Sequence, residues 1–157
     1  MKTLILVRHA EASASKGSQL DFDRSLSEMG EKQAHEMRHH LSKYSSVKML
    51  SSSSVRTSKT GAILNVDWKQ EMTFLKELYN ASAEEILFII QSQTTNQHVL
   101  IIAHNPGISQ LYYELTGDWI AFSPCSIGII EVPFDNWAEL IAEKNLKGLF
   151  ISPQQYE

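Results

Sequence analysis

Two continuous apolar runs constrain the fold of this chain more than any other feature. The segments TLILV (3–7) and HVLIIA (98–103) show no alternation of apolar and polar residues. Such runs are typical of strands that are covered on both faces, as in a parallel sheet. SAEEILFIIQSQ (82–93) opens with a Ser-x-x-Glu capping box, and NPGISQLYYEL (105–115) has apolar residues at helical spacing. Strands that alternate with helices predict an α/β fold, with a largely parallel sheet and helices on both faces.

Shorter segments extend this pattern along the chain. We expect a strand at VKML (47–50), a helix at VRTSKTGAILNV (55–66) and an extended segment at EMTFLKEL (71–78). SIGIIEV (126–132) and AELIAEKN (138–145) are predicted to be two strands, joined as a hairpin by the PFDNW turn between them.

Size and composition limit the classes of protein that fit this chain. Its 157 residues predict one domain, residues 1–157, and 43% apolar with 20% charged residues is a globular composition. The net charge of −4 argues against non-specific binding to nucleic acid or an anionic membrane. Leu4 to Val7 is too short for a signal-peptide core, and no run approaches the roughly 20 apolar residues of a membrane span. With Cys125 as the single cysteine, no intramolecular disulfide can form, so we expect a cytoplasmic protein.

The segment HEMRHH (35–40) satisfies the HExxH pattern of zinc proteases, in which two histidines on one helix face bind the metal. Ala34 and Met37 place the buried face of the predicted helix elsewhere, so both histidines of the pattern should project toward water. A catalytic zinc also needs a third protein ligand, which the following residues do not supply. We therefore interpret the segment as an exposed helix, and a zinc hydrolase as the weaker alternative.

A different set of residues follows the predicted strands. Arg8 and His9 come directly after the first apolar run, His104 comes directly after the second, and Arg56 lies one short turn past the strand at 47–50. Arg24 ends a long polar loop. In α/β folds ligands bind outside the carboxyl ends of the strands, so the two histidines should meet over one edge of the sheet. Arginine side chains bind phosphate oxygens in pairs, which predicts a pocket for a phosphate dianion.

The sequence motifs around these residues are similar to those of a known family. LVRHAEA (6–12) resembles the Arg-His-Gly/Ala signature of the histidine phosphatase superfamily. Further matches follow in the family's order: DRSLSEMG (23–30), SSSSVRTSKT (51–60), LKELYNAS (75–82) and IIAHNPG (101–107). The short chain and the last two segments resemble the small SixA-type phosphohistidine phosphatases. The resemblance implies a three-layer α/β/α sandwich like that of the phosphoglycerate mutases.

The resemblance also implies a mechanism. His9 would be the nucleophile and would form a phosphohistidine intermediate that water hydrolyses. Arg8, Arg56 and His104 would hold the phosphoryl oxygens and offset their charge. No metal and no cofactor would be needed.

Three further positions carry weaker implications. Glu77 matches the place where the superfamily often has an acid that protonates the leaving group. Arg24 matches a position at the pocket rim and could bind the substrate phosphate. Ser53 stands where the family pattern has proline, which affects the loop before Arg56 rather than the arginine itself.

Together these observations predict a phosphatase without a metal, with phosphohistidine in proteins as its expected substrate. A phosphatase for a small phosphate ester is the alternative within the same class. A mutase fits less well, because the chain has no room for the insertions that enclose a sugar-acid substrate. A phosphoprotein-binding module without turnover is the alternative in another class, although such a module would not need His9.

Overall fold

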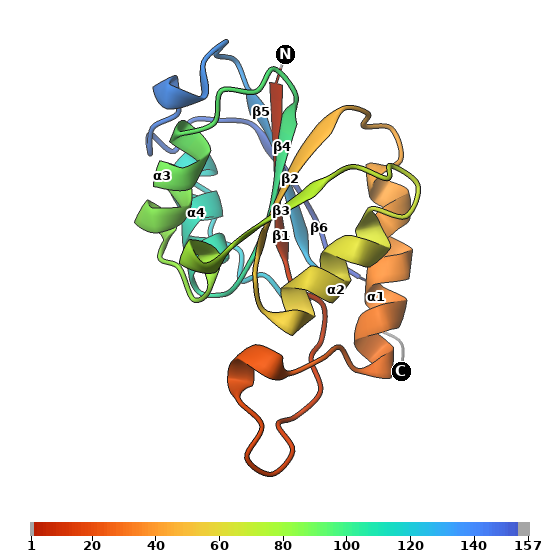
Figure 1. Ribbon diagram of the computed structural model, residues 1–157. Coiled ribbons are helices and arrows are strands. Elements are labelled where there is room, and N and C mark those ends of the chain that lie inside the picture. Colours follow the sequence, from red (N-terminus) through yellow and green to blue (C-terminus); the bar gives the residue numbers. More distant parts are fainter. Residues whose placement is uncertain (1, 154–157) are drawn as a thin grey trace.

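A computed structural model describes residues 2–153 of the chain as one mixed sheet between two layers of helices (Figure 1). The strands lie in the order β3-β2-β4-β1-β5-β6. Their bounds are β1 (Lys2–Arg8), β2 (Val47–Ser52), β3 (Met72–Leu75), β4 (His98–Ala103), β5 (Ile127–Val132) and β6 (Gly148–Ile151). The helices are α1 (Glu28–Arg38), α2 (Val55–Leu64), α3 (Ala83–Gln91) and α4 (Gly107–Thr116), with short 3-10 turns η1 (Asp21–Asp23), η2 (His39–Leu41), η3 (Lys76–Leu78) and η4 (Trp137–Glu139).

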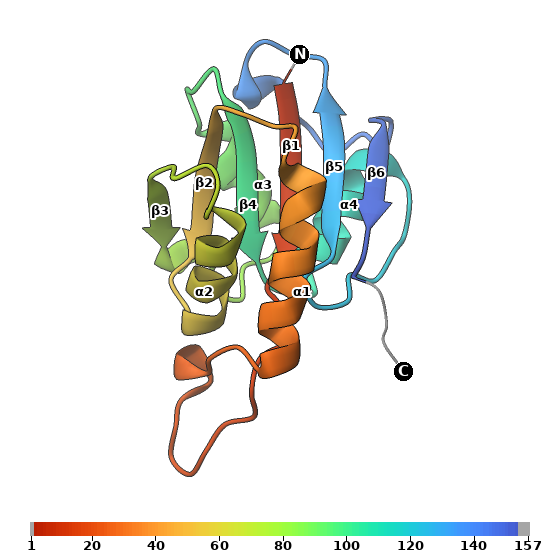
Figure 2. The same cartoon turned by 90° about the vertical axis from the view of Figure 1, so that its right-hand side faces the viewer.

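The sheet is largely parallel, as predicted. β1 and β2 both pair in parallel with β4, and β3 pairs in parallel with β2. β5 and β6 are joined to the sheet by antiparallel pairing. The carboxyl ends of β1 to β4 therefore point toward the same end of the sheet, which is also the end where the loop between β1 and α1 protrudes (Figure 2).

The side chains of β1 explain why its sequence is a continuous apolar run. Leu4 and Leu6 pack in the core on the α3–α4 face, whereas Ile5 and Val7 pack in the core on the α1–α2 face. All four side chains are fully buried. Burial of such a side chain contributes about 1.5–3 kcal/mol relative to leaving it in water, so both faces of this strand stabilise the fold.

Helix α1 begins directly after its capping residue, Ser27. The Ser27 hydroxyl accepts a hydrogen bond from the Gly30 N–H and so caps the helix. Ala34 and Met37 are buried, and the histidines of the HExxH pattern, His35 and His39, are exposed. Among residues 2–153, no group of three or more His, Cys, Asp or Glu side chains is arranged to hold a metal ion.

The predicted hairpin is wrong in its second strand. β5 pairs with β6, residues 148–151, and not with residues 138–145. The latter segment instead passes over the helical layer, because the buried side chains of Trp137 and Leu140 join the core on the α3–α4 face. Within 138–145 only Leu140 is buried, Ile141 is exposed, and the segment does not pair with β5. Within the part of the chain described here, no helix is both long and apolar enough to cross a bilayer.

Candidate active site

The ends of two neighbouring strands bring the histidines together. Arg8 is the last residue of β1 and pairs in register with Ala103, the last residue of β4. His9 and His104 directly follow these two strand ends, and the centroids of their rings lie 5.3 Å apart. Both imidazoles are almost completely buried. The two histidines thus meet over one edge of the sheet, as their positions after the apolar runs predict.

A pocket of about 340 Å³ opens at this edge of the sheet. Five of the six predicted site residues line it, and Glu77 does not. The remaining lining comes from the loop after β1 and from the segments that precede α3, α4 and β5. The full lining is Arg8, His9, Glu11, Ala12, Arg24, Arg56, Asn80, His104, Asn105 and Pro124. Three arginines at one pocket make it a site for an anion.

Hydrogen bonds select one tautomer of His9. Its Nδ1 lies 2.8 Å from the carbonyl oxygen of Ala10, which can only accept a hydrogen bond. Nδ1 therefore carries the proton, and Nε2 is left with a free electron pair. The Nε–H of Arg56 donates to this Nε2 over 3.4 Å. The nitrogen with the free pair thus lies beside a cation that can bind the oxygens of a phosphoryl group.

His104 has the opposite tautomer for the same kind of reason. Its Nδ1 lies 3.3 Å from Nη2 of Arg56, which can only donate. Nε2 must then carry the proton of the neutral ring, and it donates to the hydroxyl of Ser52 over 2.8 Å.

Burial and the neighbouring cations keep both imidazoles neutral. Burial, assisted by the charges of Arg56 and Arg8, lowers the pKa of His9 to about 4, against the opposing effect of the hydrogen bond with Ala10. Burial, followed by the proximity of His9 and Arg56, lowers the pKa of His104 to about 3. A neutral imidazole at pH 7 is the form in which a histidine can act as a nucleophile.

The hydroxyl-rich segment SSSSVRTSKT (51–60) holds Arg56 in place. The Thr60 hydroxyl donates to the carbonyl of Arg56, and accepts from the N–H of Ala10 next to His9. The Thr57 hydroxyl donates to the carbonyl of Ser52 at the end of β2. These buried hydroxyls satisfy backbone groups that water cannot reach, and so fix the start of α2 against the ends of two strands.

Within residues 2–153, Arg8 has one donor with a partner and one buried donor without a partner. Its Nη1 donates to the carbonyl of Phe122 over 2.7 Å. Its Nε is buried and has no hydrogen-bond partner within the described residues. A buried donor without a partner is costly, and the positive charge of Arg8 adds to those of Arg24 and Arg56 around the pocket.

The structure adds two residues that the sequence did not indicate, Asp21 and Tyr79. The Asp21 carboxylate accepts hydrogen bonds from Arg24, Arg56 and the Tyr79 hydroxyl. These bonds, that of Tyr79 above all, hold the pKa of Asp21 well below its usual range. Asp21 lies in the long loop after β1, whose length was the only signal in the sequence that could have drawn attention to it.

Glu77 lies away from the histidine pocket. It is exposed and lines a separate groove beside α3, together with Glu84, Glu85 and apolar residues of that helix. The 3-10 turn η3 causes this separation, because it buries Leu78 in the core and turns the following residues toward the pocket. Tyr79 and Asn80, rather than Glu77, are the residues of this segment that reach the site.

Comparison with known proteins agrees with this geometry. Residues 4–86 match the model of the histidine phosphatase superfamily (branch 1). An uncharacterised chloroplastic protein of Arabidopsis thaliana is 28% identical over 155 residues, which cover 90% of this chain and 71% of that protein.

Solved structures share the fold over nearly the whole chain. The SixA protein of Nakamurella multipartitia has a TM-score of 0.83 at 24% identity, covering 97% of this chain and 96% of that one. The SixA protein of Agrobacterium tumefaciens has a TM-score of 0.81 at 22% identity, covering 98% and 99% of the two chains. The protein histidine phosphatase SixA in complex with tungstate has a TM-score of 0.78 at 21% identity, covering 96% and 97%.

Proposed function

The chain belongs to the histidine phosphatase superfamily, and from this we propose that it is a phosphatase in which His9 is the nucleophile and phosphohistidine in proteins is the substrate. The observation that carries the proposal is the tautomer of His9. The Nδ1–H of His9 donates to the Ala10 carbonyl. The free electron pair on Nε2 lies beside Arg56, in a pocket with three arginines.

The reaction has two steps that exchange groups at phosphorus. His9 Nε2 forms a bond to phosphorus while the bond from phosphorus to the leaving group breaks, and the leaving group takes that electron pair. Water then attacks the phosphorus of the phosphohistidine, the bond to Nε2 breaks, and phosphate departs with both water protons as His9 regains its free pair. Throughout, the proton stays on Nδ1 and donates its hydrogen bond to the Ala10 carbonyl, so the ring keeps its orientation.

The cations of the pocket stabilise charge on the phosphoryl oxygens. Arg56 is a donor beside the nucleophile, and Arg8 and Arg24 line the same pocket. Donors that are already in position where charge develops lower the barrier most, because they need no rearrangement during the reaction. One protein with the same fold, SixA, is described in complex with tungstate, a tetrahedral oxyanion like phosphate.

The choice of phosphohistidine rests on the leaving group. A departing alkoxide needs a proton from an acid, whereas an imidazole that already carries a proton on its other nitrogen leaves as a neutral ring. Of the described acidic side chains, Glu11 lines the pocket and Asp21 contacts its arginines, and the low pKa of Asp21 makes it a poor proton donor. The proposal assigns no step to Glu77, which lines a different groove.

The test is release of phosphate from a phosphohistidine peptide, measured before and after a metal chelator is added. We expect turnover by the wild-type protein and none by His9→Asn, which keeps a polar side chain of similar reach. His35→Asn is the matched control, because it removes an exposed histidine of the HExxH pattern, and it should retain wild-type activity.

Other outcomes would identify other functions. If the protein turned over only small phosphate esters, these and not phosphohistidine would be its substrates. Binding of a phosphopeptide without any turnover would favour the binding module. Loss of activity on adding the chelator, or in His35→Asn, would contradict the proposal and favour a metal site on α1.

A further inference from the structure

We propose that Asp21 is a specificity-determining residue, whose negative charge beside Arg56 favours phosphohistidine over phosphate esters that arrive as dianions. This inference rests on the proposed function, because it concerns the choice of substrate at the same pocket.

Asp21 is bound to the pocket by four hydrogen bonds. Its carboxylate accepts from Nη1 of Arg24 over 2.9 Å, from Nη2 of Arg56 over 3.0 Å and from the Tyr79 hydroxyl over 2.5 Å. Its backbone carbonyl accepts from Nη1 of Arg56 over 2.8 Å. Both Nη atoms of Arg56 thus contact the same residue, and this fixes a negative charge at the pocket.

The same guanidinium joins this charge to the histidines. Nη2 of Arg56 contacts both the Asp21 carboxylate and Nδ1 of His104, while its Nε contacts His9. A phosphoryl group about to be transferred to His9 therefore shares Arg56 with Asp21. Each additional negative charge on the substrate is repelled by a carboxylate a few ångströms away, where screening by water is incomplete.

This repulsion distinguishes two classes of substrate. A phosphate ester with both oxygens ionised brings a charge of minus two. Phosphohistidine with a protonated imidazole ring brings the same phosphoryl group with a net charge of minus one. Asp21 thus penalises the ester more than the phosphohistidine.

Asp21 also suits the departure of an imidazole. When the bond between phosphorus and nitrogen breaks, the electron pair goes to that nitrogen, and the proton on the other ring nitrogen remains there. The half-exposed Asp21 carboxylate can accept a hydrogen bond from that N–H. It cannot donate a proton to an alkoxide, because Arg24, Arg56 and Tyr79 stabilise its ionised form.

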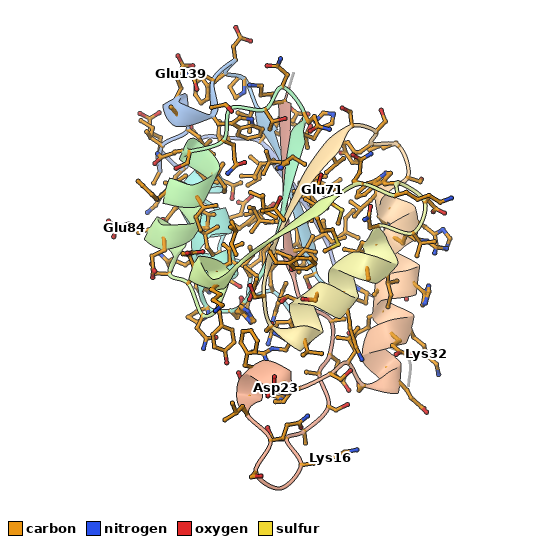
Figure 3. The ribbon with its side chains drawn as sticks, in the orientation of Figure 1. Lys16, Asp23, Lys32, Glu71, Glu84 and Glu139 are labelled. Atoms are coloured by element: carbon orange, nitrogen blue, oxygen red, sulfur yellow. The ribbon has the colours of Figure 1, made fainter. Side chains whose placement is uncertain are left out.

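The turn that carries Asp21 supplies a matched control. Asp23 lies two residues further along η1 (Figure 3) and is exposed. Its carboxylate makes no hydrogen bond or ion pair with any described residue. Asp23→Asn therefore removes one negative charge from the same turn without altering the contacts of Arg56.

The experiment compares Asp21→Asn with Asp23→Asn on two substrates, a phosphohistidine peptide and 4-nitrophenyl phosphate, whose leaving group needs no acid. We expect Asp21→Asn to prefer the peptide less than the wild-type protein does. The kcat/KM for the peptide, divided by that for the ester, should fall by about tenfold or more, because one nearby negative charge is removed. The inhibition constant of inorganic phosphate should fall severalfold. Asp23→Asn should change neither quantity.

Equal losses on both substrates in Asp21→Asn, with an unchanged ratio, would overturn the proposal and leave Asp21 as a residue that only positions Arg56. Weaker or unchanged phosphate binding would overturn it as well. If the wild-type protein turns over neither substrate, the proposed function fails separately. Titration with inorganic phosphate, followed by NMR of the histidine rings, then still decides whether Asp21→Asn binds the anion more tightly.

Discussion

Nε of Arg56 lies 3.4 Å from Nε2 of His9, although 47 positions in the chain separate the two residues. A guanidinium can only donate a hydrogen bond, so His9 must present a free electron pair to it. The contact therefore fixes both the charge and the tautomer of the imidazole. Nucleophile and phosphate-binding group are already paired before any substrate is bound, which limits the rearrangement that the reaction requires.

Arg56→Lys should lower kcat/KM for a phosphohistidine peptide by about 10²-fold, although it keeps the charge, because lysine cannot contact both histidines with a planar fork. The exposed Lys59, on the next turn of α2, provides the control, and Lys59→Ala should stay close to wild type. Steady-state kinetics of both variants measure the difference. A loss in Lys59→Ala as large as that in Arg56→Lys would show that α2, rather than the guanidinium, is responsible.

Activity should be lost only at an unusually low pH. A nucleophilic histidine must be neutral, and burial lowers the pKa of His9 to about 4. The value of kcat/KM reports the ionisation of the free enzyme. It should therefore not change near pH 6.5 through protonation of His9, and should fall only as the pH approaches about 4. Rates measured between pH 4 and 8 in buffers of constant ionic strength test this. A half-maximal rate at about pH 6.5, the ordinary pKa of histidine, would contradict it.

Stability should fall with acid over the same range. Between pH 6.5 and about 4 the unfolded chain binds protons at His9 and His104, while the folded protein does not. The free energy of unfolding then decreases as the pH falls, by about 1.4 kcal/mol per pH unit for each such group. Urea unfolding at pH 7, 6 and 5 gives this slope.

A substitution isolates the contribution of one ring. His104→Gln should reduce the slope by about 1.4 kcal/mol per pH unit, whatever it does to stability at neutral pH. His40→Gln removes an exposed histidine and should leave the slope unchanged. Equal slopes in wild type and His104→Gln would mean that the buried ring takes up its proton in the folded state.

Ser52→Ala should lower activity through His104. The Ser52 hydroxyl accepts the Nε2 proton of His104, and without it the ring loses the partner that keeps Nδ1 toward Arg56. We expect kcat/KM to fall about tenfold and stability to fall by about 1–3 kcal/mol, the cost of an unsatisfied buried donor. Nitrogen chemical shifts of the imidazole report the tautomer directly. Ser53→Ala, in the adjacent position, is the control, and a tautomer unchanged in Ser52→Ala would contradict the assignment.

Much of the fold could be predicted because its physical causes are local. Apolar runs without alternation indicate strands buried on both faces, and Ser27 and Ser82 cap the helices that follow them. The prediction of a strand at 138–145 was wrong, since Leu140 packs in the core on the α3–α4 face and Ile141 is exposed. Nothing in a short apolar segment distinguishes burial against a helix from burial within a sheet.

The parts of the site that lie at strand ends follow directly from the sheet, whereas Arg24 and Arg56 were predicted from their place in the motifs. Arg8, His9 and His104 are positioned by β1 and β4, so their meeting follows from parallel pairing alone. Asp21 lies in an irregular loop, and Glu77 lies in a 3-10 turn that directs it away from the pocket. No periodic pattern in the sequence indicates that Asp21 lies at the pocket or that Glu77 lies away from it.

The sequence by itself determined the class of fold, the edge of the sheet where the histidines lie, and the family. Those properties depend on hydrophobic pattern and on residues adjacent to strands, which are encoded within a few positions of each other. Only the tertiary structure decided the tautomers of His9 and His104, their lowered pKa values and the charge of Asp21 beside Arg56. These properties depend on burial and on contacts between distant segments, which exist only when the whole sheet has assembled.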